Sequence, residues 1–146
     1  MTPDASLLRR VVLASALYDF VVTVPFATPW TAEVVLAQVR SAHHALSLGG
    51  EPLPAFTPTH LFFVALFGTI VTLWSVVRLF QPTAFNGAAD TAGRALFSSW
   101  MVWALTQGAT QVLLGFLALE LAWMFAQGGA ILAGRRWRGG IPATAR

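Results

Sequence analysis

Two acidic residues stand inside long apolar stretches of this 146-residue chain and are its first candidates for chemistry. Asp19 lies roughly 14 Å beyond Arg10, measured along a helix, and Glu120 lies roughly 22 Å before Arg135. Both depths fall near the middle third of a bilayer. A carboxyl group there costs about 2.5–3.5 kcal/mol, so it is expected to face a bundle interior and to mark a functional site.

Two interpretations of these acids are open. In the functional one they form a protonatable pair, or one of them binds the polar group of a ligand. His60, Trp100 and Trp103 are then the further candidates, with His60 above the acids and the tryptophans lining a pocket. In the structural one the acids are neutral or hydrogen-bonded, the tryptophans pack between helices, and the acids hold helices in register. The expected hydrogen-bond partners are Tyr18, Thr23, Thr69, Ser98 and Ser99.

Metal and catalytic chemistry find little support in the sequence. His43 and His44 suit zinc or copper as residue types, but adjacent side chains project about 100° apart on a helix. They are weak candidates, and no metal site is predicted. No Ser/His/Asp arrangement, GxSxG turn or phosphate-binding glycine loop occurs, so no catalytic residue is predicted.

The composition indicates what kind of scaffold holds these residues. Hydrophobic residues make up 56% of the chain and charged residues 10%, against roughly 25% charged in a soluble domain. The mean hydropathy is +0.66. The chain lacks cysteine, and its basic residues are all arginines that occur near segment ends. These features predict a membrane protein and argue against nucleic-acid binding.

The apolar pattern predicts an all-α membrane protein, a four-transmembrane-helix antiparallel bundle that forms one domain over residues 1–146. The expected spans are about 7–26, 59–80, 88–107 and 111–133, each near the 20 residues that cross a bilayer. Residues 134–146 form the tail. Asp90 and Arg94, four apart, are expected to pair on the helix surface, with Arg94 extending outward to the interface.

Residues 27–58 are predicted to form an external segment between the first two spans. Within it, residues 31–47 show apolar side chains at helical spacing and polar ones opposite, typical of an amphipathic helix on the membrane surface. Thr31 is the expected N-cap. Arg40 is the sole arginine of this segment. The other eight arginines fall on the opposite side, which predicts cytoplasmic termini in a bacterial-type inner membrane.

The layout resembles the DoxX-like group of small four-helix membrane proteins. The matching stretches run from Leu17 through Tyr18, Asp19 and Pro25 to Trp30, then over residues 34–48 and 52–67. The first helix lacks the Gly-Lys type ending of that group. The resemblance implies a four-helix bundle with a helical excursion after the first span. It also implies a functional class of either quinone-linked redox components or accessory factors.

Three functions are consistent with these observations. The first is a non-catalytic accessory or assembly subunit of a larger inner-membrane complex, in contact with lipid and with other membrane subunits or copies of itself. The second is a redox component that binds a quinone or another small ligand through the intramembrane acids. The third is a small transporter, for which inverted repeats and interrupted helices are lacking.

Overall fold

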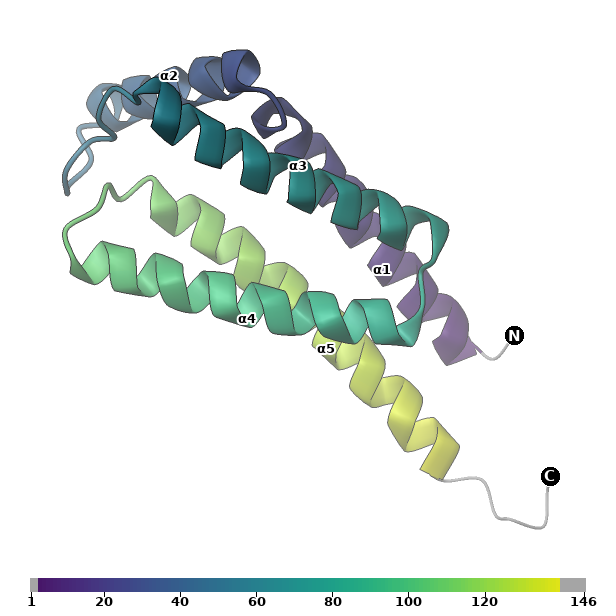
Figure 1. The fold of residues 1–146 in the computed structure, drawn as a ribbon. Helices are drawn as coiled ribbons and strands as arrows, with labels where there is room; N and C mark the ends of the chain where they lie inside the picture. Colours follow the sequence, from purple (N-terminus) through teal and green to yellow (C-terminus); the bar gives the residue numbers. More distant parts are fainter. Residues whose placement is uncertain (1–2, 140–146) are drawn as a thin grey trace, which may run out of the picture.

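The computed structural model describes the backbone of residues 3–139, and the described residues are helical, without a named strand. This confirms the prediction of an all-α protein. Five α-helices and one 3-10 turn follow one another along the chain (Figure 1). They are α1 (Pro3–Thr23), η1 (Val24–Phe26), α2 (Pro29–Ala45), α3 (Pro58–Phe80), α4 (Ala84–Thr106) and α5 (Leu113–Gly139).

Threonine-proline pairs begin two of the helices. Thr28 caps α2, where its hydroxyl accepts a hydrogen bond from the Thr31 amide, and Pro29 follows within the first turn. Thr57 caps α3 in the same way, and His60 completes a capping box. Proline suits the first turn because its missing N–H would have no helical partner. The predicted cap at Thr31 is therefore wrong, and α2 begins earlier.

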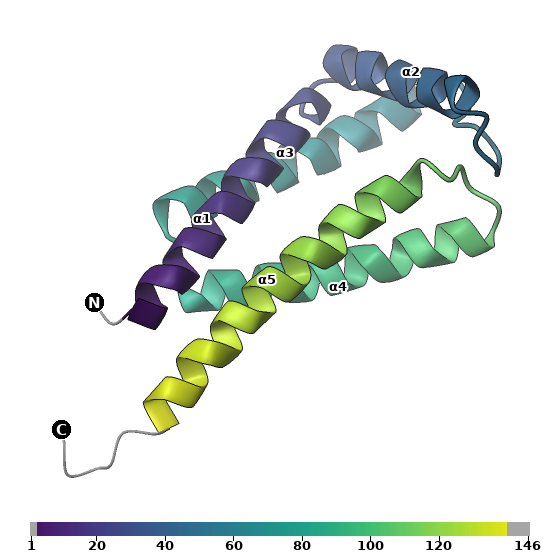
Figure 2. The same cartoon turned by 180° about the vertical axis from the view of Figure 1, so that it is seen from behind.

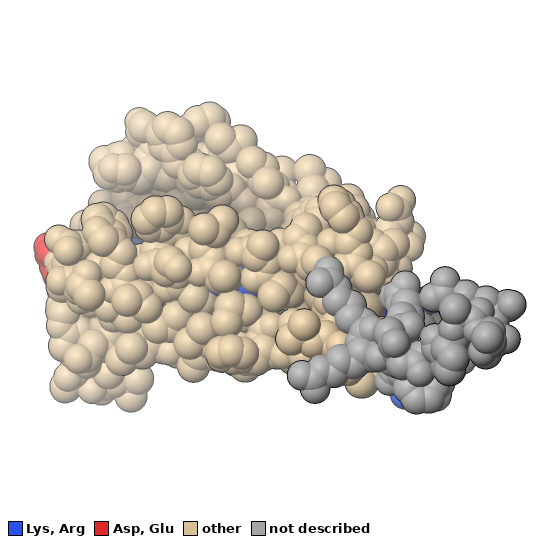
Figure 3. Space-filling model, turned by 90° about the horizontal axis from the view of Figure 1, so that it is seen from below, with Lys and Arg blue, Asp and Glu red and all other residues tan. Residues whose placement is uncertain are grey.

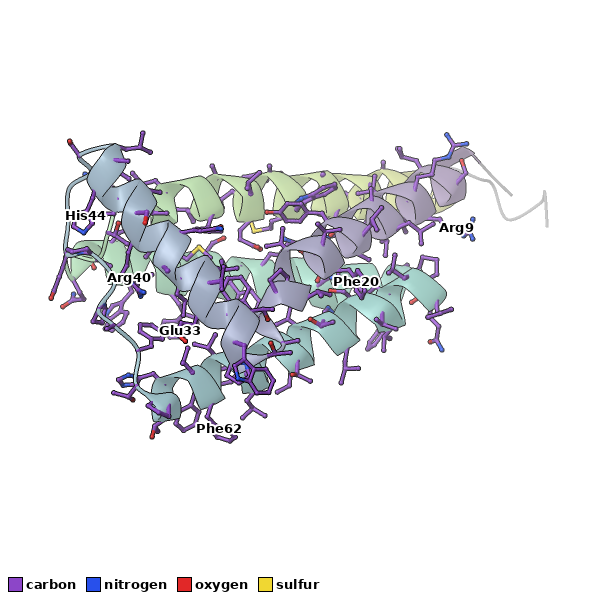
Figure 4. The ribbon with its side chains drawn as sticks, turned by 90° about the horizontal axis from the view of Figure 1, so that it is seen from above. Arg9, Phe20, Glu33, Arg40, His44 and Phe62 are labelled. Atoms are coloured by element: carbon purple, nitrogen blue, oxygen red, sulfur yellow. The ribbon has the colours of Figure 1, made fainter. Side chains whose placement is uncertain are left out.

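The chain bends by 101° between the segments Ser6–Phe26 and Pro29–Ala45. The turn η1, which contains Pro25, makes this corner. Gly68 on α3 permits the corner to pack closely, because a Cβ there would lie 2.3 Å from the Phe26 carbonyl oxygen. The predicted helix after the bend is confirmed as α2. Its polar side chains Glu33, Arg40 and His44 lie at the end of the molecule opposite Arg9 (Figure 4).

The helices form two units, α1 with α3 and α4 with α5, and α1 joins them by packing on α5 (Figure 2). The small apolar core lies at this junction and contains Leu8, Val12 and Ala130, with Val11 and Ile131 packed against it. In contrast, α3 and α4 meet near their shared short loop and separate toward the other end (Figure 1). The start of α1 and the end of α5 lie at the same end of the molecule.

A second connection joins the two units at the far end, between the α2–α3 and α4–α5 loops. The Glu51 amide donates to the Gly108 carbonyl (2.7 Å), and the Gln111 amide donates to the Gly49 carbonyl (3.0 Å). Gly49 also donates to Gln111 Oε1 (3.0 Å). Beside these contacts, His43 Nδ1 and Thr110 Oγ1 form a buried hydrogen bond of 2.8 Å. We call this set of contacts the loop clasp.

Much of the surface is apolar. Large hydrophobic side chains on every α-helix are exposed, and few are buried. The face in Figure 3 is almost entirely uncharged. Two helical segments of the described chain, Pro58–Phe80 and Leu113–Gly134, are long and apolar enough to cross a membrane. The number rises to three if the bent pair of α1 and α2 counts as one span. An exposed apolar surface of this extent is compatible with a protein whose helices face lipid.

Candidate functional site

Four helices place polar side chains on faces that point into the molecule. Within each helix these residues are four or seven positions apart, which puts them on one side. The pairs are Ser15 and Asp19 on α1, Trp74 and Arg78 on α3, Asp90 and Arg94 on α4, and Glu120 and Gln127 on α5. Because the four faces converge, charges far apart in sequence meet in the interior.

Arg94 connects carboxylates from three helices. Its Nε lies 2.9 Å from Asp90 Oδ2, its Nη1 lies 2.8 Å from Glu120 Oε2, and its Nη2 pairs with Asp19 Oδ2. The Arg94 side chain is 3% exposed. A planar guanidinium with five donors can make such a set of bonds, whereas a lysine ammonium offers only a point charge.

Arg78 supplies the second cation and is fully buried. It pairs with Asp19 through Nη2 and with Asp90 Oδ2 through Nη1, at 2.8 Å for the latter. Ser15 Oγ accepts from Arg78 Nη1 at 3.3 Å and from Arg94 Nη2 at 2.9 Å. These contacts define what we call the ionic cluster: Asp19, Arg78, Asp90, Arg94 and Glu120.

Asp90 is the most fully bonded carboxylate of the ionic cluster. Besides its two arginine partners, Trp74 Nε1 donates to Oδ1 at 3.1 Å and Gln127 Nε2 donates to Oδ2 at 2.7 Å. The predicted Asp90–Arg94 pair exists, but it is buried rather than on the helix surface. The expected outward course of Arg94 is wrong, because three carboxylates hold its side chain in the interior.

A cavity of about 360 Å³ adjoins the ionic cluster and is lined by residues of α1, α3, α4 and α5. Asp19, Asp90, Arg94 and Glu120 provide its charged part, next to Tyr18. Its other walls are mainly apolar, with Val22, Ile70, Val71, Phe97, Met101 and Phe116. Its size lies at the lower end of the roughly 300–1,000 Å³ typical of small-molecule sites. Such a cavity suits a ligand with an apolar body and a polar head.

Asp19 and Glu120, the two acids that the sequence identified as candidates, meet in this site. Arg94 bridges Asp19 and Glu120, and both carboxylates line the cavity. The partners are not those expected: arginines replace the predicted hydroxyl groups, and Thr23 instead shares a hydrogen bond with Thr72 (3.1 Å). The roles of the two acids in ligand or proton handling stay predictions.

The other predicted site residues lie elsewhere. His60 is at the exposed start of α3, in its capping box with Thr57. Trp100 and Trp103 are 63% and 60% exposed and do not line this cavity. His43 is buried in the loop clasp, with His44 exposed beside it. Within the described part of the chain, no group of three metal-ligating side chains comes together.

Sequence reasoning missed the arginine half of the site. It placed Arg78 and Arg94 among the positive charges that set orientation, and Asp90 at a helix surface. The sequence did contain a pattern that indicates the buried site. Ser15 and Asp19 are four residues apart, as are Asp90 and Arg94, and each pair lies in an otherwise apolar helix. Polar residues four apart in such a helix mark a buried polar face.

The comparisons with known proteins give no assignment. No family model matches the chain, and neither a curated protein nor a solved structure matches it. The site must therefore be interpreted from its own chemistry.

Proposed function

We propose that this chain is a membrane-embedded binding protein for an amphiphilic small molecule. The proposal rests on the cavity beside the ionic cluster, which combines apolar walls with a charged end. The cavity lies between α1, α3, α4 and α5. A ligand taken from the bilayer would place its apolar part between α3 and α4 and its head against the charges. A membrane quinone belongs to this ligand class, as does a charged amphiphile.

The membrane arrangement that we propose has four spans in a bacterial-type inner membrane, with both termini cytoplasmic. The exposed Arg9 and Arg10 near the start of α1 support this orientation. Arg78 and Arg94 do not count as evidence for the orientation, because both are buried and paired with carboxylates of the ionic cluster. Single cysteines can test it, since the chain has none. An impermeant maleimide should label His44→Cys in intact bacterial cells, and Ala84→Cys only after the cells are opened; the reverse pattern would overturn the arrangement.

Ligand binding can be tested by filling the cavity. Gly93 lines it, and a Cβ built on Gly93 has nothing within 4 Å. Gly93→Phe should therefore occupy the cavity without a backbone clash. The matched control is Gly129→Phe, because Gly129 is exposed and also has open space around a built Cβ.

The measurement is mass spectrometry of small molecules extracted from protein purified in a mild detergent. We expect a stoichiometric amphiphile with the wild type and with Gly129→Phe, and its loss from Gly93→Phe. Circular dichroism would check that both variants are folded. Equal extracts from the two variants, or no amphiphile from the wild type, would overturn the proposal.

A second candidate function, the accessory subunit, draws on a different surface. Leu96, Trp100 and Trp103 are all exposed and follow one another at helical spacing on α4. Aromatic side chains of this kind are enriched where proteins meet. A stoichiometric protein that co-purifies with the wild type and is lost from the double variant Trp100→Ala/Trp103→Ala would support this role, and retention of it would contradict the use of this surface.

A further inference from the structure

The ionic cluster contains more negative than positive groups. It has three carboxylates, Asp19, Asp90 and Glu120, and two guanidinium groups, Arg78 and Arg94. With all five groups ionised, one negative charge has no cation to balance it among the described residues. A buried charge is costly unless it is paired, so this surplus favours an additional positive group at the cluster.

The carboxylate oxygens that receive no hydrogen bond belong to residues that line the cavity. Asp19 uses Oδ2 for both of its arginine partners, and Glu120 uses Oε2 for its single one. The other oxygen of each carboxylate, Asp19 Oδ1 and Glu120 Oε1, receives no hydrogen bond from the described part of the chain. Both residues line the cavity. Asp90, in contrast, has bonds on both oxygens.

The donors near the cavity are largely committed. Arg94 uses Nε and both Nη atoms within the cluster. Trp74 Nε1 already donates to Asp90. A ligand carbonyl, such as that of a quinone, would find the Tyr18 hydroxyl and the second Nη1 hydrogen of Arg94 as donors. A ligand N–H would find two carboxylate oxygens that also carry the surplus negative charge. Tyr18 and Phe116 add aromatic rings to the same cavity, and such rings also attract cations.

We infer that the cavity selects an amphiphile with a cationic amine head, which donates hydrogen bonds to Glu120 and Asp19 and balances the charge of the ionic cluster. This inference rests on the proposed function and names the ligand class for that same site. Glu120 is the stronger contact, since its side chain has one arginine partner and is 18% exposed. A quinone head does not meet these requirements.

The test compares three ligands with one tail: n-decylammonium, n-decanol and n-decyl sulfate. Each is added at equal mole fraction to purified protein in nanodiscs of uncharged lipid, and bound ligand is counted by native mass spectrometry. We expect decylammonium to bind the wild type at least about tenfold more tightly than decanol, the factor expected for one hydrogen bond to a charged group. Decyl sulfate should bind least.

Substitutions at Glu120 test whether this carboxylate binds the ammonium head. Glu120→Gln should weaken decylammonium binding about tenfold or more, and Glu120→Asp should restore part of it. The matched control is Glu33→Gln, which removes a carboxylate from the exposed surface of α2 and should leave binding unchanged. An equal loss in Glu33→Gln and Glu120→Gln would overturn the inference. The wild-type ligand series needs no variant, so it stays decisive if Glu120→Gln fails to fold.

The two proposals fail in different ways. If decanol binds as well as decylammonium and Gly93→Phe abolishes both, the cavity binds amphiphiles and the cationic preference is refuted. If decylammonium binds the wild type and Gly93→Phe alike, it does not use this cavity, and the inference is again refuted. If no ligand binds and purified protein carries none, the proposed function falls together with the inference.

Discussion

The ionic cluster and the loop clasp join the same two helix units by different means. The cluster uses five charged side chains from four helices in the interior, around residues such as Arg94 and Asp19. The clasp uses mainly backbone groups of two loops, such as Glu51 and Gly108, with one buried side-chain pair. A buried charge is stable only while its partners are present, because no water replaces a lost partner. Backbone groups at a surface can form hydrogen bonds with water instead. The cluster should therefore be far less tolerant of substitution.

The largest effect is expected from Arg94→Leu. It removes a cation that contacts three carboxylates and leaves Arg78 alone against them. Breaking a buried pair costs about 3–5 kcal/mol, so we expect a loss of that size in the free energy of unfolding. Denaturant unfolding in bicelles measures it. The control is Arg40→Leu, because the structure gives Arg40 a single hydrogen bond within the described residues, to the Pro54 carbonyl. Similar losses from both variants would refute the central role of the cluster.

A smaller effect distinguishes the carboxylates within the cluster. Among the described residues, Asp19 pairs with both arginines of the cluster and Glu120 pairs with Arg94 alone. Asp19→Asn should cost about 2–3 kcal/mol and Glu120→Gln about 1 kcal/mol or less, because the first change weakens two arginine contacts and the second weakens one, while either change removes the surplus negative charge. Thermal unfolding of the two variants side by side checks the order. A greater loss from Glu120→Gln would contradict the view that the number of arginine contacts sets the cost.

Alanine substitutions at two glycines test the loop clasp. Gly50 and Gly108 both have positive φ, 85° and 89°. A Cβ on Gly50 would lie 2.3 Å from the Ala109 carbonyl oxygen, but one on Gly108 meets nothing within 4 Å. Both alanine variants should lose about 1 kcal/mol to the left-handed backbone. Only Gly50→Ala should also open the clasp, measured as faster amide exchange at Glu51 and Gln111 with unchanged exchange near Arg94.

The smallest effect concerns the buried hydrogen bond between His43 and Thr110. Thr110→Val keeps the shape of the side chain and removes the hydroxyl, which should cost about 0.5–1.5 kcal/mol. A double-mutant cycle with His43→Phe isolates the shared part of that cost. A coupling energy near zero would mean that the loops are held by their backbone contacts alone.

The all-helical class and the bounds of one helix followed directly from the residues. The predicted span over residues 59–80 nearly coincides with α3 (Pro58–Phe80), because a capping threonine and two prolines mark its ends. The helix after the first span is likewise present as α2. Asp19 and Glu120 were identified from their depth alone, since a carboxylate in an apolar segment is conspicuous in sequence.

The direction in which the polar side chains point could not be read from the sequence. On helices that are apolar all round, hydropathy has little angular preference, so it does not determine the rotation of a helix about its axis. Arg94 and Arg78 could equally extend toward an interface in a sequence-based interpretation. In the structure both arginine side chains point inward, because carboxylates from other helices pair with them there. A buried charge is stable only where such partners are present.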